Sequence, residues 1–246
     1  RLAGIGHDHQ DQHRRQLRLS EHGGCNARLW PGPLEAITFK GVTAPMARTN
    51  VDNIKAIHQL ATLTEQQDGI NWYPNARQIA YRLAERYDIH PAEAIGVIAA
   101  LSPRNRWERN VQDAEALIAD YVAGGAEQAA LTKVCTFGAN KGKAIRILEA
   151  GVLTDEDVLN ILSGPKLQEF YICIRGGIPD VCIDGHAYCI WNGGRTSITD
   201  VPSIGVKLRR EIKADYATAA DELGMTASAL QAITWVAWRR IHGITK

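Results

Sequence analysis

The sequence predicts an all-α protein, and three observations support this fold class. Side chains that repeat with a period of 3.6 form stripes, most clearly near the C-terminus at Leu230, Ile233, Thr234, Ala237, Trp238 and Ile241. Residues that start and stop helices flank such stretches, and no alternating apolar–polar run indicates a strand. With 246 residues and 45% hydrophobic content, the chain can bury a core as one domain or as two lobes.

The helix boundaries follow from local signals. Pro91 suits the first position of a helix, where its missing N–H costs nothing, and Ser102-Pro103 ends that helix and caps the next. Gly124-Gly125 ends a helix, and the run Thr154-Asp-Glu-Asp157 is typical of a capping box. The predicted helices span about 51–65, 75–87, 91–101, 103–122, 154–162, 166–175, 185–192, 206–223 and 227–242.

The first 45 residues differ in composition from the rest of the chain. They are rich in His, Gln, Arg, Gly and Pro, and they show no sustained periodicity. We therefore expect residues 1–45 to form a poorly ordered N-terminal extension, and an ordinary domain to begin at Met46.

Composition excludes several classes of protein. No run approaches the roughly 18 apolar residues that a membrane span needs, so we expect a soluble protein of the cytoplasm. The five cysteines form no Cys-x-x-Cys pair, and their odd number argues against a disulfide framework. We expect no metal and no cofactor. The net charge of +1 hides local basic clusters, such as Lys207, Arg209, Arg210 and Lys213, which suit a DNA-facing surface and equally suit ordinary solvated helix faces.

The segment most suggestive of chemistry joins a lysine to an aspartate. A turn at Gly164 and Pro165 places Lys166 at the start of an apolar helix, and a short apolar run then leads to Asp184, 18 positions after the lysine. An amine and a carboxylate so placed could face one another across a cleft. Two earlier segments accompany them, Ala99-Ala-Leu-Ser-Pro-Arg-Asn-Arg-Trp107 and Phe137-Gly-Ala-Asn-Lys-Gly-Lys-Ala-Ile-Arg146.

These segments, in this order, resemble those of the helix-hairpin-helix DNA glycosylases, a superfamily in which Gly-x-Lys and Val-Asp-x-His elements follow one another. The resemblance covers roughly residues 90–193. It implies a divergent, phage-like monomer in the cytoplasm of a bacterial or phage-infected host cell. It implies no iron–sulfur cluster, because only Cys189 follows Asp184. It also implies two helical lobes flanking a cleft, one formed by residues 90–193 and the other by 46–89 together with 194–246.

The resemblance also implies roles for particular residues. Lys166 would attack the sugar as a nucleophile, and Asp184 would stabilise the positive charge that develops there. The residues implied to bind DNA are Arg104, Asn105, Trp107, Asn110, Lys141, Lys143, Gly164 and His186. If one helix carries them, the spacing of three places Arg104, Trp107 and Asn110 along one side.

Each of these residues could instead have a purely structural role. Asp184 could serve only as a helix N-cap, Lys166 as a solvated first-turn lysine, and His186 as a packing histidine. Trp107 could equally be a core residue, and Trp72 and Tyr73 are expected in the core of the second lobe. The turn also departs from the family pattern, because Pro165 lacks the backbone N–H that such a hairpin offers to phosphate.

The expected function is that of a DNA glycosylase, with or without lyase activity, that flips out and excises a modified or damaged base from double-stranded DNA. One alternative keeps the fold but modifies the base, as a transferase acting on hypermodified thymine in phage DNA. Another alternative is a non-catalytic DNA-binding helical module.

Overall fold

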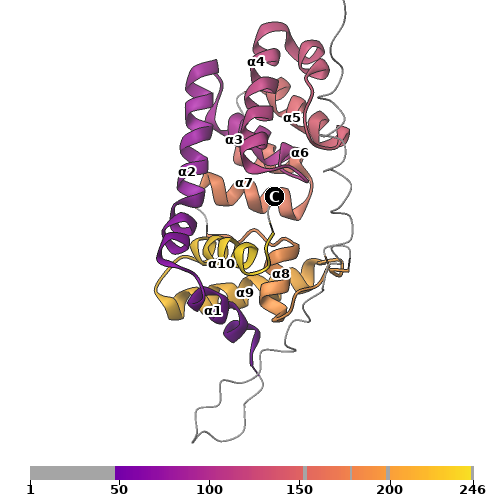
Figure 1. Cartoon of the computed structure of the whole chain (residues 1–246). Coiled ribbons are helices and arrows are strands. Elements are labelled where there is room, and N and C mark those ends of the chain that lie inside the picture. Colours follow the sequence, from indigo (N-terminus) through magenta and orange to yellow (C-terminus); the bar gives the residue numbers. More distant parts are fainter. Residues whose placement is uncertain (1–47, 152–153, 178, 198–199, 245–246) are drawn as a thin grey trace, which may run out of the picture. The chain divides into compact units, whose positions relative to one another are not determined.

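The computed structural model describes residues 48–151, 154–177, 179–197 and 200–244, and this part of the chain is all-helical, with no strand (Figure 1). The expected extension of residues 1–45 lies outside the described residues. The ten described helices are α1 (Asn50–Gln59), α2 (Leu63–Tyr87), α3 (Pro91–Leu101), α4 (Trp107–Leu131), α5 (Gly138–Ala150), α6 (Asp155–Leu162), α7 (Pro165–Arg175), α8 (Gly185–Asn192), α9 (Val206–Leu223) and α10 (Ala227–Ile241).

Most helix boundaries agree with the sequence, but the expected helix over 51–65 is wrong beyond Gln59. Thr62 and Glu65 form a capping box that starts a new helix, and α2 then continues through Pro74 without a break. This single 25-residue helix therefore includes residues 63–65 of the first predicted helix and the whole of the predicted helix over 75–87. Packing against other helices outweighs the local cost of the proline.

The expected helix over 103–122 is wrong at its start. It begins at Trp107, because Ser102 to Arg106 form a turn in which Arg104 has a positive φ of 57°. Its expected end at Gly124-Gly125 is confirmed, because the backbone angles of both glycines are not helical, and a further helical stretch then runs to Leu131 as the second part of α4.

Two hydrophobic cores divide the described helices. The first core is built by α2 to α7. The second is built by α1, α8, α9 and α10 with Val181 and Ile183 from the segment before α8. In Figure 1, α2 runs from beside α10 up to α3, and so joins both groups of helices. At this junction Gly69 allows α2 to lie directly on α10, since a Cβ there would come within 2.5 Å of Ile233.

The two cores do not share the residue boundaries of the two lobes that the sequence predicts. Most of α2 packs in the first core, although residues 46–89 were assigned to the second lobe. Helix α8 packs in the second core, although residues 90–193 were assigned to the first lobe. Lys166 therefore starts a helix of the first core, and Asp184 starts a helix of the second.

Candidate active site

Lys166 lies in the first turn of α7, at an exposed position. Ser163, in the left-handed region with φ of 44°, ends α6, and Gly164 then caps α7 with an extended backbone. The Lys166 amine reaches no carboxylate or carbonyl acceptor among the described residues. The turn thus presents a free amine at a helix start.

Asp184 caps the N-terminus of α8. The sequence predicts this structural role for Asp184 as the alternative to a catalytic one. Its Oδ1 accepts hydrogen bonds from the backbone N–H groups of His186 and Ala187, both at 2.9 Å. Its Oδ2 accepts none from the part of the chain that the structure describes. Because the residue is only half-buried, one carboxylate oxygen holds the helix while the other remains open to a ligand.

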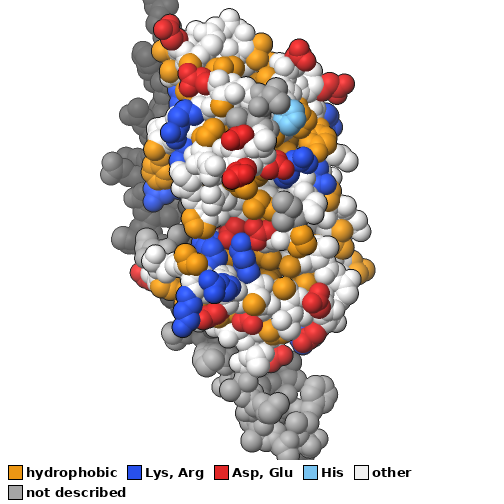
Figure 2. All heavy atoms as spheres, turned by 180° about the vertical axis from the view of Figure 1, so that it is seen from behind, with side chains coloured by type: hydrophobic (Ala, Val, Ile, Leu, Met, Phe, Trp, Pro, Cys, Tyr) orange, Lys and Arg blue, Asp and Glu red, His pale blue; other side chains and the backbone are white. Residues whose placement is uncertain are grey.

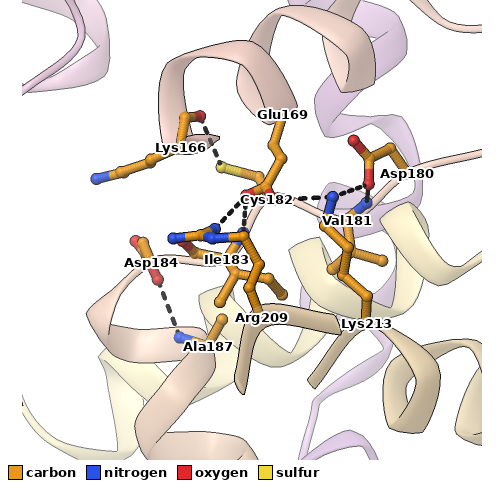
Figure 3. A network of polar contacts seen from close by, with 10 residues as sticks. All are labelled: Lys166, Glu169, Asp180, Val181, Cys182, Ile183, Asp184, Ala187, Arg209 and Lys213. Atoms are coloured by element: carbon orange, nitrogen blue, oxygen red, sulfur yellow. Dashed lines mark hydrogen bonds and ion pairs between the residues drawn. The ribbon is translucent and has the colours of Figure 1, made fainter. Parts of the chain in front are cut away.

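Direct contacts hold the two segments against each other. Cys182 Sγ lies 3.8 Å from the backbone oxygen of Lys166, and the backbone N–H of Ile183 donates to Glu169 Oε2 at 2.9 Å. Figure 3 shows the side chains of Lys166 and Asp184 extending to the same side of this contact. Residues 18 positions apart in the sequence therefore flank one contact between α7 and the segment before α8.

His186 lies at the centre of the charges around this site. Burial lowers the pKa of its imidazole, and the neighbouring carboxylate of Asp184 opposes that shift. The cations Arg239, Lys166 and Arg195 lower the pKa further. The ring also lies edge-on to Trp235, at 6.5 Å between centroids. His186 therefore packs as a neutral ring within electrostatic range of both Lys166 and Asp184.

Sequence reasoning missed Glu169, which is the centre of a buried ion-pair network. Its side chain is 4% exposed, and it contacts Arg209 at 2.5 Å and Lys213 at 2.8 Å, both from α9. Lys213 also pairs with Asp180 at 2.5 Å (Figure 3). Burial raises the pKa of the Glu169 carboxyl, while Lys213, the Ile183 N–H and Arg209 act to lower it. The only local signal was an acidic residue among the buried positions of α7.

Arg209 and Lys213 belong to a basic cluster that the sequence made a candidate DNA-facing surface. In the structure both side chains turn inward to Glu169 instead. Arg209 Nη1 also donates to the backbone oxygen of Ile183 at 3.0 Å. These two cations therefore support the segment that carries Asp184.

A row of aromatic rings includes Phe170, which lies one turn after Lys166 on α7. The centroid of Trp72 is 5.0 Å from that of Trp107, 5.7 Å from Phe170 and 4.9 Å from Tyr73. Tyr73 is buried in the first core, rather than in the second as expected, and its hydroxyl donates to Gln231 of α10 at 2.8 Å. The rings of Trp72, Trp107 and Phe170 are half-buried, so their remaining surface is open to a planar ligand.

The predicted stripe of Arg104, Trp107 and Asn110 does not form, because Arg104 precedes α4. The Arg104 guanidinium lies 5.1 Å from the ring centroid of Phe137, in the turn before α5. Asn110 is 1% exposed and donates to the backbone oxygen of Ile98 at 3.0 Å. Asn105 donates to the buried carboxylate of Asp113 at 3.0 Å. Both amides therefore shape the turn, and Arg104 lies exposed at its tip.

The predicted DNA-binding lysines of α5 contact backbone oxygens of neighbouring segments. Lys141 Nζ donates to the backbone oxygens of Ala130 and Thr132, the latter at 2.6 Å. Lys143 Nζ donates to the backbone oxygen of Leu162 at 2.6 Å, which supports the turn before Gly164. Both amines therefore link α5 to α4 and α6 through hydrogen bonds to backbone oxygens.

Comparison with known proteins assigns the chain to a family. The model of a family of unknown function, DUF7178, matches residues 38–242. The chain belongs to this family. No curated protein and no solved structure matches it.

The remaining surface of the DUF7178 chain carries mixed charge. Figure 2, which views the face opposite that of Figure 1, shows Lys and Arg side chains gathered in the lower half beside Asp and Glu. A cavity of about 520 Å³ opens elsewhere, between α2 and α4, and neither Lys166 nor Asp184 lines it.

Within the described residues no three His, Cys, Asp or Glu side chains are grouped so as to hold a metal ion. No helix in the same part of the chain is both long and apolar enough to cross a membrane. Cys135, Cys173, Cys182 and Cys189 are free thiols.

Proposed function

We propose that this protein is a DNA N-glycosylase, which flips a modified or damaged base out of double-stranded DNA and cleaves its bond to deoxyribose. One observation carries the proposal. The free amine of Lys166 and the open oxygen of Asp184 come from two segments that direct contacts hold together, beside a half-exposed row of aromatic rings. The order of α6, turn, α7 and an N-capping aspartate at α8 supports a helix-hairpin-helix glycosylase-like fold, with the site between the two cores.

Asp184 is the residue on which the chemistry depends most. Cleavage of the bond between base and sugar leaves positive charge on the sugar ring, and a nearby carboxylate stabilises that charge. The Asp184 Oδ1 is held by two backbone N–H groups, which orients the carboxylate before substrate arrives. Oδ2 is then available to face the sugar or to take a proton from the attacking nucleophile.

Lys166 would supply that nucleophile. Its amine attacks the sugar carbon C1′, the base departs with the bonding electrons and takes up a proton, and the amine loses one. The sugar ring opens to an imine between lysine and DNA, and elimination of the 3′ phosphate from this imine nicks the strand. If water attacks in place of the lysine, base is released and the strand stays intact.

The aromatic row is suited to hold the extruded base. Base–aromatic stacking contributes about 1–3 kcal/mol per base and tolerates different bases. Trp72, Trp107 and Phe170 leave half-exposed rings on three helices, close to the start of α7. The turn at Gly164 would meet the DNA backbone, although Pro165 offers no N–H to a phosphate.

The test is mass spectrometry of bases after incubation of the protein with a panel of normal, damaged and phage-modified double-stranded DNAs. Release of a free base from at least one DNA, together with a borohydride-trapped adduct where lyase activity accompanies it, supports the proposal. Release of no base from any DNA contradicts it. A gain in mass of a base that stays in the DNA, retained in Lys166→Ala, would indicate the base-modifying transferase instead. DNA binding without any product, unchanged in Lys166→Ala and Asp184→Asn, would indicate a non-catalytic module.

A further inference from the structure

The residue before Asp184 is held in an unusual way. Ile183 is 1% exposed and lies in a segment without helix or strand, so regular structure does not satisfy its backbone groups. Its N–H donates to Glu169 at 2.9 Å, and its C=O accepts from Arg209 at 3.0 Å. A carboxylate and a guanidinium that pair with each other at 2.5 Å thus bind both backbone groups of one residue.

The two charged residues come from different cores. Glu169 lies on α7, one turn after Lys166, and Arg209 lies on α9 of the second group of helices. Lys213, also of α9, holds the other oxygen of Glu169 and at the same time pairs with Asp180. The segment from Asp180 to Asp184 is therefore fixed to the helix that carries the lysine (Figure 3).

We propose that Glu169 is a positioning residue for the reaction, which sets the place of the Asp184 carboxylate relative to Lys166 by binding the backbone N–H of Ile183. This inference rests on the proposed function. Stability alone does not explain the arrangement, because buried ion pairs add little net stability over apolar side chains of similar size. An apolar side chain at position 169, however, would leave the Ile183 N–H buried without an acceptor.

The chain contains a matched control for this role. Glu65 is also buried, at 8% exposed, pairs with Arg240 at 2.6 Å and accepts from the backbone N–H of Thr62 at 2.8 Å. It therefore shares the chemistry of Glu169, but it lies at the start of α2 and contacts neither Lys166 nor the segment before Asp184. Glu65→Met measures what the loss of a buried, paired carboxylate that also binds a backbone N–H does to the protein as a whole.

The experiment compares Glu169→Met and Glu65→Met in the full chain, because methionine has nearly the shape of glutamate but offers no oxygen to a backbone N–H. We expect Glu169→Met to slow single-turnover base release by about 10- to 100-fold, because small displacements of reacting groups have effects of this size. DNA affinity should stay within about twofold, because no DNA-contacting group is removed. Glu65→Met should release base at the wild-type rate. Base release by Glu169→Met at the wild-type rate would overturn the proposal, as would an equal loss in both variants.

Amide hydrogen exchange at Ile183 gives a second measurement that needs no activity. We expect exchange at this N–H to be faster in Glu169→Met than in the wild type and in Glu65→Met. If the wild-type protein releases no base from any DNA, the proposed function fails, and this exchange alone decides the placement of the segment. Equal exchange in all three proteins would overturn the role of Glu169.

Discussion

The turn before α4 and the segment before α8 both lack regular structure, and both are held by a buried carboxylate from a neighbouring helix. In the turn, Asp113 of α4 accepts from Asn105 at 3.0 Å, from the backbone N–H of Cys135 at 2.7 Å and from Arg109 at 2.6 Å. In the segment, Glu169 of α7 binds Ile183, Arg209 and Lys213.

The two regions differ in which polar side-chain groups remain without a hydrogen bond. In the turn, the amides of Asn105 and Asn110 donate to Asp113 and to a backbone oxygen. In the segment, buried side chains hold the backbone, and the amine of Lys166 and one oxygen of Asp184 make no hydrogen bond within the described residues. Because other residues hold the backbone around Lys166 and Asp184, the amine and the second carboxylate oxygen are not needed for the structure of the segment.

The largest effect on stability is expected from Glu169→Ala. Removing this carboxylate leaves Arg209, whose side chain is 14% exposed, without its counter-charge, and the unfolding free energy should fall by about 3 kcal/mol. Glu65→Ala should cost about 1 kcal/mol, because its partner Arg240 is 49% exposed and water can solvate it. Urea unfolding followed by circular dichroism measures both. Equal losses of unfolding free energy in the two variants would show that Glu169 contributes no more to stability than Glu65 does.

Asp113→Ala should cost about 2 kcal/mol, since it leaves the Cys135 N–H and the Asn105 amide without their acceptor. If the turn is mainly structural, the affinity of the folded variant for DNA should be unchanged in a titration monitored by fluorescence anisotropy. Glu108→Ala, an exposed change on the same helix, is the control and should alter stability by less than about 0.5 kcal/mol. A loss of DNA affinity confined to Asp113→Ala would show that the turn itself meets DNA.

Trp107→Ala should weaken DNA binding by about 1–2 kcal/mol, because it removes one ring of the row that we propose to stack on the extruded base. Tyr81→Ala removes an aromatic side chain that is 41% exposed on α2 but lies outside the row, and it should leave the affinity unchanged. Competition binding with DNA that carries a flipped-out base analogue measures the difference. Equal affinities in the two variants would place the base elsewhere.

The smallest expected effect concerns pH. Burial lowers the pKa of His58 and His186 below the ordinary value of 6.5, so the folded chain takes up these protons at lower pH than the unfolded chain. Stability conferred by the neutral rings is complete above pH 6.5 and falls as the pH drops through that value toward the lower folded pKa. Thermal melts between about pH 7.5 and 5.5 should show this fall, and His58→Gln should reduce its slope. An unchanged slope would mean that His58 makes no such contribution.

Local signals predicted much of the fold but not the contacts of the site. Pro91, the Thr154 capping box and Asp184 mark the starts of α3, α6 and α8, because helix caps depend on a few neighbouring residues. The passage of α2 through Pro74 was missed, because it depends on packing against α10 and α3.

Side-chain partners distant in sequence could not be predicted in this way. Glu169 binds Ile183 14 residues later and Arg209 40 residues later, and no local pattern marks such pairs. The sequence predicts that Lys141 and Lys143 contact DNA. It does not reveal the backbone oxygens that accept from their amines, because these oxygens belong to other segments. The Lys166–Asp184 pair could be proposed because each residue stands at a helix start, a feature that the sequence does reveal.

The most direct test of the central claim is single-turnover base release by Asp184→Asn, on whichever DNA the wild type acts upon. Asparagine can still cap α8 through its side-chain oxygen, so the variant should fold and bind DNA as the wild type does. Loss of the negative charge should slow base release by about 100-fold or more. Base release by Asp184→Asn at the wild-type rate would contradict the account.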